Sequence, residues 1–301
     1  MLLLLIWILK EGEVNILAFI DEQLKEFKRL IEDSIREGGA KGKTSMIRSS
    51  HLINLIHDAV KYELQQYGAY SDQVFPPFNK SKPEIKIAGF LKQKDQDVCV
   101  VPNSIPKKQE RITWGPLAFE NKIDEYGYEF SDNTLVINVR SQMSSLAKNS
   151  DTLFERTFAE AQNLHMRYEN MVLGEVYLIP IHEYDDAAVK NYEVKFKRNQ
   201  TDVEKYISFF NSINNRKRGE EPYKYERCTL LVVDFNRESP KLYRNSAELI
   251  EDGIISEDFP IEYATLSFDT FIQDLLEVYK ERYNLQSIAR VEVYVKKLAE
   301  L

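Results

Sequence analysis

The sequence predicts a mixed α/β protein in which helices flank one β-sheet. Segments with apolar residues at helical spacing alternate along the chain with short apolar runs rich in β-branched residues, which are typical of buried strands. The composition over 301 residues, 43% hydrophobic, 29% charged and 12% aromatic, is that of an ordinary globular protein. We expect an N-terminal helical arm over residues 1–45 and one α/β domain over residues 46–301.

The first nine residues, MLLLLIWIL, form an apolar run that Lys10 and Glu11 end. Nine residues are too few to span a bilayer, and the run has neither the basic leader nor the small-residue cleavage site of a signal peptide. We expect this run to dock as a strand or a helix, and we expect no association with a membrane.

The net charge and the two cysteines indicate which kinds of protein this sequence can encode. The net charge of -8 argues against a wholly basic nucleic-acid-binding surface, although it says nothing about local patches. Cys99 and Cys228 each lie in an apolar run without a CxxC spacing. This pattern predicts reduced core residues in a cytoplasmic protein.

Two helices are expected before the first strands. Apolar residues recur at helical spacing from Ile16 to Arg36, and the segment GGAKGKTS at 38–45 is expected to end that helix. A second helix is predicted from Ser49 to Tyr67, with a serine at its start and Gly68 as its stop.

The segment IKIAGFLKQKDQDVCVV at 85–101 predicts a hairpin of two short strands around a polar turn at Lys92–Gln96. The region Pro102–Asn133 is turn-rich and charged. The remaining elements follow in alternation: a strand from Leu135 to Val139, a helix at 150–168, a strand at 172–181, a helix at 202–213, a strand at 228–235 and a helix at 268–283.

The strand that begins at Leu135 carries two polar residues on one face. Asn138 and Arg140 are two residues apart, so their side chains point to the same side of the strand. An apolar core would reject both. They therefore point into a polar cleft or, if the strand lies at a sheet edge, into water.

Three features in order resemble the type II restriction endonucleases of the PD-(D/E)xK nuclease superfamily. They are a helix with Glu63, the hairpin PEIKIAGFLKQKDQDVCVV with Asp97, and the strand VINVR before a long helix. The segment INVRSQMSSLAKNSDTLFERTFAEAQNLH is also similar to segments of predicted restriction enzymes. The likeness covers about residues 46–285 and implies a restriction-endonuclease-like fold, a mixed β-sheet flanked by helices.

The resemblance implies a Mg²⁺ site built around Asp97. The acid and lysine of the family pair fall on Asn138 and Arg140, so that pair reads N-V-R here. Asn138 can bind a metal through its carbonyl oxygen, whereas Arg140 cannot act as a base but can hold a phosphate with two hydrogen bonds. Glu155 is expected to replace the missing carboxylate, and Glu63 to support the metal.

A second alignment uses Glu84 and Lys86, a literal E-x-K in PEIK, with Asp72 upstream. Asp72 lies in a proline-flanked loop without a strand pattern around it. We therefore prefer the alignment on Asp97.

Basic residues gather where a nuclease would contact phosphates. They flank the hairpin and bracket the later helix: Lys80, Lys82, Lys86, Lys92, Lys94, Lys107, Lys108, Arg111, Lys195, Lys197, Arg198, Arg216, Lys217 and Arg218. The loop with Asn215, Arg216, Lys217 and Arg218 is the expected DNA-binding loop.

The predicted function is a Mg²⁺-dependent type II restriction endonuclease that cleaves double-stranded DNA at a specific sequence. The resemblance further implies a partner methyltransferase in the same system, and palindromic sites favour a homodimer. The alternative is a catalytically silent DNA-binding or interaction protein on the same fold, which the N-V-R departure favours.

Overall fold

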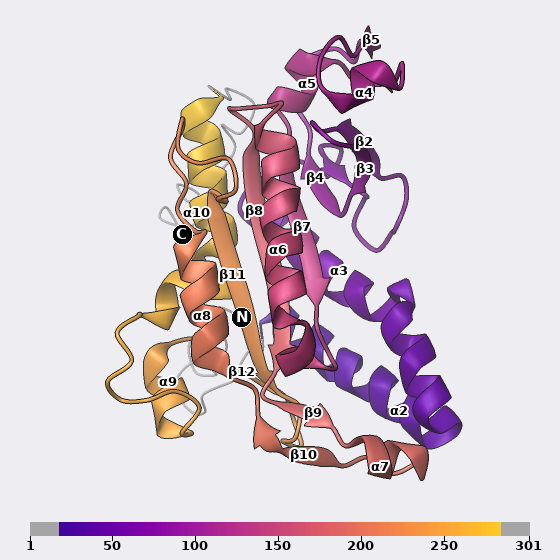
Figure 1. Cartoon of the computed structure of the whole chain (residues 1–301), viewed down its shortest axis with the longest axis vertical. Coiled ribbons are helices and arrows are strands. Elements are labelled where there is room, and N and C mark those ends of the chain that lie inside the picture. The colour runs from indigo at the N-terminus through magenta and orange to yellow at the C-terminus, as the bar shows by residue number, and fades with distance from the viewer. Residues whose placement is uncertain (1–17, 284–301) are drawn as a thin grey trace, which may run out of the picture.

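The structure, a computed structural model, describes residues 18–283, so the expected docking segment at the N-terminus lies outside the described residues. A sheet in the order β1-β4-β7-β8-β11-β12 forms its centre (Figure 1). The strands are β1 (Val74–Phe75), β4 (Val98–Val100), β7 (Leu135–Ser141), β8 (Val172–Pro180), β11 (Arg227–Asp234) and β12 (Lys241–Leu242).

The three central strands are parallel, and the outer pairs are antiparallel. The crossover from β7 to β8 is helix α6 (Leu146–His165), and the crossover from β8 to β11 contains helix α8 (Val203–Ser212). All nine residues of β8 are buried. A parallel strand that is covered by helices on both faces has this nearly continuous apolar sequence.

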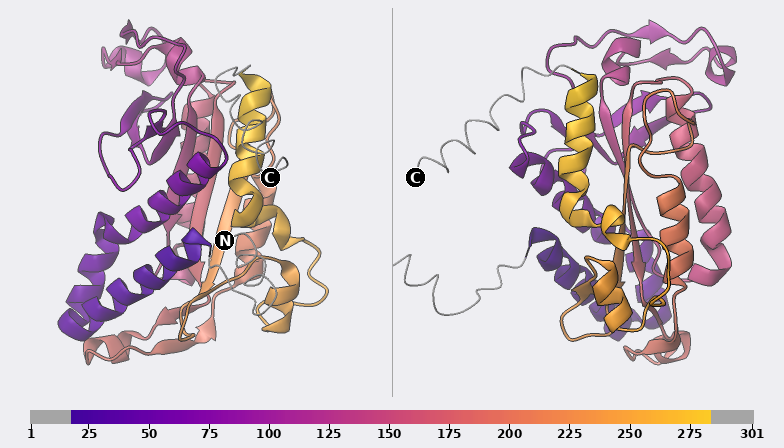
Figure 2. Two further views of the ribbon diagram at one scale, coloured as in Figure 1. Left: turned by 180° about the vertical axis from the view of Figure 1, so that it is seen from behind. Right: turned by 90° about the vertical axis from the view of Figure 1, so that its left-hand side faces the viewer.

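Helices cover both faces of the sheet, as the edge-on view in Figure 2 shows. Helices α6 and α8 pack with alternate strand residues such as Val136, Leu173 and Tyr177. Helices α2 (Phe19–Arg48), α3 (Ser50–Gln66) and α10 (Phe268–Arg282) pack with the other set, including Ile137 and Val176. The predicted α/β class with flanking helices is confirmed at this level.

Smaller elements surround these layers. Two hairpin pairs lie between α3 and β7, and a third follows β8. The elements are β2 (Ile85–Ala88), β3 (Gln93–Gln96), β5 (Glu110–Arg111), α4 (Pro116–Phe119), β6 (Ile123–Asp124), α5 (Tyr128–Asp132), β9 (His182–Tyr184), α7 (Asp186–Lys190), β10 (Phe196–Gln200), α9 (Ser246–Glu251) and the 3-10 helix η1 (Tyr263–Leu266).

The expected break of the first helix within 38–45 occurs at Gly39, where the backbone is not helical, but the segment is not a loop, because helical structure resumes after Gly39 and runs to Arg48. Gly39 kinks the helix with a φ of 53°, and a Cβ there would lie 3.1 Å from the carbonyl oxygen of Val189. Only glycine combines this φ with so close an approach at no steric cost. The buried face of α2 belongs to the same core as the sheet, so the described part of the arm is not a separate unit.

The hairpin is also arranged differently from the prediction. The turn lies at 89–92, and the polar segment expected as a turn is strand β3. Asn163 of α6 fixes this turn, since its Oδ1 accepts hydrogen bonds from the backbone N of Leu91 at 2.7 Å and of Lys92 at 3.2 Å. Because Asn163 and Leu91 are about 70 residues apart, the residues around the turn give no sign of this contact.

The other main elements agree with the sequence to within a few residues. Ser49 starts α3 by accepting a hydrogen bond from the backbone N of His51. Helix α6 begins four residues earlier than expected. Within residues 18–283, no helix has the length and apolar character needed to cross a membrane.

Candidate functional site

A group of polar residues lies on the α6 side of the sheet, across three adjacent strands. We call Asp97, Asn138, Arg140, Glu160 and Glu175 the polar cluster. Asp97 lies between β3 and β4, and its Oδ2 accepts a hydrogen bond from the backbone N of Val139 at 2.9 Å. Asn138 on β7 pairs directly with Glu175 on β8. The edge-strand alternative for Asn138 and Arg140 is excluded, because β7 is internal to the sheet.

Asn138 and Glu175 are fully buried, and neither side chain has a hydrogen-bond partner. The amide nitrogen and oxygen of Asn138 and both carboxylate oxygens of Glu175 are unsatisfied. Leaving one such group unpaired costs about 1–3 kcal/mol, and more if it is charged. Unsatisfied polar groups this concentrated are rare in proteins and point to a functional role or a bound group.

Arg140 links the cluster to helix α6. Its Nη1 donates to Oγ1 of Thr157 at 2.8 Å and lies 3.5 Å from Oε1 of Glu175. Its Nη2 lies 3.6 Å from Oε2 of Glu160. Lys94 of β3 lies on the other side of Glu160, with its Nζ 3.1 Å from Oε1. The cluster therefore contains three carboxylates and one cation, and Lys94 lies beside it as a second cation.

The electrostatic environment shifts the pKa values of Glu175 and Arg140. Burial raises the pKa of Glu175 to about 7, although the nearby Arg140 lowers it in part. Burial alone would lower the pKa of Arg140, but Glu175 and Glu160 raise it above its ordinary value. A buried carboxyl group with a pKa near neutrality is suited to proton transfer or to metal binding.

The donor atoms of the cluster fit a hard cation in chemical type. Asp97 and Glu175 supply carboxylates and Asn138 an amide oxygen, and the side chains of Glu175 and Asn138 accept no hydrogen bond. Mg²⁺ prefers such oxygen ligands and usually keeps several waters, so it needs only one or two carboxylates. Over residues 18–283, no three His, Cys, Asp or Glu side chains group closely enough to hold a metal by themselves.

Two of the expected site residues lie elsewhere. Glu63 is on the opposite side of the sheet, where burial and the nearby Asp269 of α10 raise its pKa. Burial lowers the pKa of His57, six residues earlier on α3, and the nearby Asp97 opposes this shift in part. The expected role of Glu63 as a metal-supporting acid therefore does not fit its position.

Glu155 is exposed on the outer surface of α6, beside Phe154 and Phe209. It points away from the sheet because the inner face of α6 carries Thr157 and Glu160 instead. The expected replacement of the missing carboxylate by Glu155 is corrected: Glu175 and Glu160 are the carboxylates beside Asn138 and Arg140.

Glu175 was detectable in the sequence. It is the one charged residue in VLGEVYLIPI, and the argument that singled out Asn138 applies equally to it. What the sequence did not provide is the register that sets Asn138 opposite Glu175.

One residue of the loop expected to bind DNA, Arg216, is buried in the protein interior. Arg216 is 3% exposed, and its Nη1 lies 2.9 Å from Oε1 of Glu226, so it cannot reach DNA without breaking a buried ion pair. Asn215, Lys217 and Arg218 are exposed. The DNA-binding expectation stays open for these three residues alone.

The alternative E-x-K alignment gains no support from the geometry. Glu84 forms an ion pair with Lys82, and the Nζ of Lys86 lies 3.9 Å from the exposed Asp95. Asp72 is exposed in a turn before β1.

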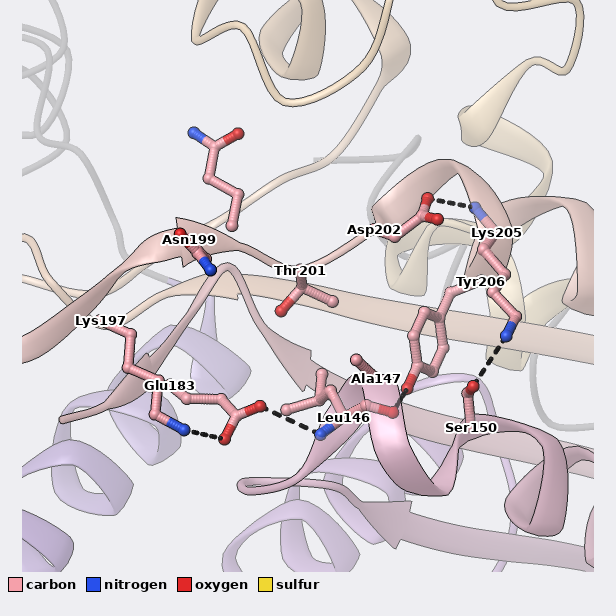
Figure 3. A pocket seen from close by; sticks show the side chains of 11 residues that line it. Leu146, Ala147, Ser150, Glu183, Lys197, Asn199, Thr201, Asp202, Lys205 and Tyr206 are labelled. Atoms are coloured by element: carbon pink, nitrogen blue, oxygen red, sulfur yellow. Dashed lines mark hydrogen bonds and ion pairs between the residues drawn. The ribbon is translucent and has the colours of Figure 1, made fainter. Parts of the chain in front are cut away.

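A hollow of about 390 Å³ lies at the start of α6, at the carboxyl ends of β7 and β8 (Figure 3). Glu183 fills the position that an external anion would take: its carboxylate accepts from the backbone N of Ser145 at 2.9 Å and of Leu146 at 3.0 Å. Lys197 neutralises it at 3.1 Å. The amide groups at the start of α6 and the carboxylate of Glu183 are therefore already paired within the protein.

No protein-family model, curated protein or solved structure matches this chain.

Proposed function

We propose that this protein is a Mg²⁺-dependent endonuclease that hydrolyses phosphodiester bonds at a specific sequence of double-stranded DNA, in the manner of a type II restriction enzyme. One observation supports the proposal most: two fully buried side chains without hydrogen-bond partners, Asn138 and Glu175, lie side by side on adjacent strands, with Asp97 and Arg140 nearby. These oxygens and the neighbouring guanidinium are groups of the chemical type that phosphodiester hydrolysis uses.

Each residue of the polar cluster has a role in this proposal. Asp97, Asn138 and Glu175 would hold Mg²⁺, which when bound polarises a phosphoryl group and lowers the pKa of an attacking water. Arg140 and Lys94 would offset negative charge that develops on the phosphate. Glu160 would hold these two cations in place, since it lies within 3.6 Å of both.

Contacts with the DNA backbone would come from the exposed Lys217 and Arg218, with Asn215 beside them. A palindromic recognition site would be served by a homodimer. A restriction enzyme also requires a cognate methyltransferase that protects the host DNA. The proposal therefore includes such a methyltransferase as a second protein of the same system.

The test incubates the purified protein with unmodified plasmid and phage DNA, with Mg²⁺ or with EDTA. Discrete Mg²⁺-dependent fragments are expected. Asp97→Ala should abolish Mg²⁺-dependent cleavage, because it removes a carboxylate ligand of the proposed metal site. The matched control is Asp95→Ala, an exposed aspartate two residues earlier, which should cut normally. Cleavage by Asp97→Ala at the wild-type rate, with both variants folded by circular dichroism, would exclude this site.

A second candidate function is DNA binding without cleavage. It is favoured by Arg140, which lies between Glu175 and Glu160 as it would in a purely structural buried network. The two functions differ in metal binding. A protein that binds a labelled duplex but shows no calorimetric Mg²⁺ binding and leaves all DNA intact is the silent form.

A further inference from the structure

The buried Arg216 and the partly buried Arg282 share one carboxylate oxygen of Glu226, just before the start of β11. Nη1 of Arg216 and Nη1 of Arg282 each lie 2.9 Å from Oε1 of Glu226. Their side chains are 1% and 9% exposed. Like charges this close and this desolvated repel each other unless further negative charge compensates them.

Both carboxylate oxygens of Glu226 already have partners. Its Oε2 accepts from the backbone N of Leu173 at 2.7 Å and lies 3.3 Å from Nε2 of His165. Burial opposes its ionisation, but His165 and Arg282 hold its pKa at about 2, so it carries one negative charge at all working pH values. One charge cannot balance two guanidinium groups.

A cavity of about 620 Å³ opens beside these arginines. Five of its lining side chains are basic, and we call them the basic pocket: Arg216, Lys217, Arg218, Arg227 and Arg282. Glu281 is the one acidic residue of its lining. Among residues 18–283, neither Lys217, Arg218 nor Arg227 makes an ion pair with a carboxylate.

The pocket is distinct from the polar cluster. It lies between the loop after α8 and the last turns of α10, and Figure 1 shows both at the same end of the sheet. No residue lines both places, and the polar cluster is on the α6 side of the sheet.

We propose that the basic pocket is a binding site for a phosphate group, held by Arg227, Lys217 and Arg218 over the paired Arg216 and Arg282. Guanidinium groups match the oxygens of a phosphate in planar two-bond contacts, and a lysine adds a point charge. The phosphate belongs either to a DNA backbone, which would deepen the proposed function, or to a free phosphate or phosphomonoester, which requires no cleavage activity.

The experiment titrates sodium phosphate into the full-length protein by calorimetry, in EDTA and at an ionic strength held constant with sodium chloride. The test variant is Lys217→Ala/Arg218→Ala, because both side chains are exposed and hold no buried partner. The control is Lys190→Ala/Lys195→Ala, which removes the same charge from exposed positions on and after α7. We expect the wild type and the control to bind phosphate, and the test variant to bind it about tenfold or more weakly, as loss of two charge-assisted contacts implies.

A second arm measures the anisotropy of a fluorescein-labelled DNA duplex, also in EDTA. If the test variant loses affinity for the duplex and phosphate displaces the duplex from the wild type, the phosphate is that of DNA. If phosphate binding is lost and duplex binding is unchanged, the ligand is a free phosphate. The proposal is overturned if the wild type shows no phosphate binding, or if the test and control variants bind it equally. Because neither arm depends on cleavage, a protein that cuts no DNA gives a readable result.

Discussion

Glu175 is a carboxyl group in the middle of a sheet, and its protonation couples to folding. In the unfolded chain it ionises near its ordinary value of 4.5, and burial raises its folded pKa to about 7. The folded protein therefore binds more protons between these values. The stability that this group contributes is fully present below pH 4.5 and is lost as the pH rises through about 7.

Replacing Glu175 with glutamine removes this dependence. The difference between the two pKa values corresponds to about 3 kcal/mol. The free energy of unfolding of the wild type, relative to Glu175→Gln, is therefore expected to fall by about 3 kcal/mol between pH 4.5 and 8. Urea denaturation of both proteins across this range measures it.

The control for this measurement is Glu155→Gln on the exposed face of α6, which should show a constant difference from wild type. A constant difference for Glu175→Gln as well would mean that Glu175 has the same pKa in the folded protein as in the unfolded chain. In that case Arg140 compensates its burial, and the cluster is a closed structural network.

At the scale of elements, the start of α6 depends on a residue far away in the sequence. Ser145 has a left-handed φ of 55° and provides no side-chain cap. Glu183 of β9 satisfies the first two amide groups in its place. A carboxylate at a helix N-terminus accepts hydrogen bonds and interacts favourably with the partial positive charge there.

Glu183→Ala should therefore destabilise the protein by about 1–2 kcal/mol, the usual cost of losing a helix cap. It should also raise amide hydrogen exchange in the first turn of α6. The measurements are the denaturation midpoint and exchange by mass spectrometry. Glu193→Ala, which loses an exposed ion pair with Lys195 after α7, is the matched variant with little expected effect. Equal results for the two variants would contradict the capping role.

At the scale of the molecule, α2 is part of the sheet's own core. Ile20, Leu24, Phe27, Ile31 and Ile35 are each at most 1% exposed, and they pack in one cluster with strand residues and α10. Burying a side chain of this size contributes about 1.5–3 kcal/mol. The five together contribute on the order of 10 kcal/mol, which is comparable to the whole stability of a domain.

A chain that starts at residue 46 is therefore expected not to fold. Circular dichroism and thermal melting of the truncated and full-length proteins test this. A truncated chain that melts cooperatively near the full-length midpoint would show instead that residues 46–301 form an independent domain, as the sequence pattern predicted.

The sequence by itself determined the α/β class, the main helices and strands, and the presence of polar residues in a buried strand. These features follow from local periodicity, because the repeats of strands and helices involve residues that are close together in the sequence. Asn138 and Arg140 were found in this way, and the same reasoning would have found Glu175.

The tertiary structure decided which residues distant in the sequence lie next to one another. The register of β7 and β8 sets Asn138 beside Glu175, and the phase of α6 turns Glu160 inward and Glu155 outward. Glu226 holds Arg216 in a buried ion pair, away from the surface of the loop that was expected to bind DNA. The turn at 89–92 and the start of α6 likewise depend on Asn163 and Glu183. These contacts join residues about 10 to 70 positions apart, and local sequence preferences carry no information about such pairings.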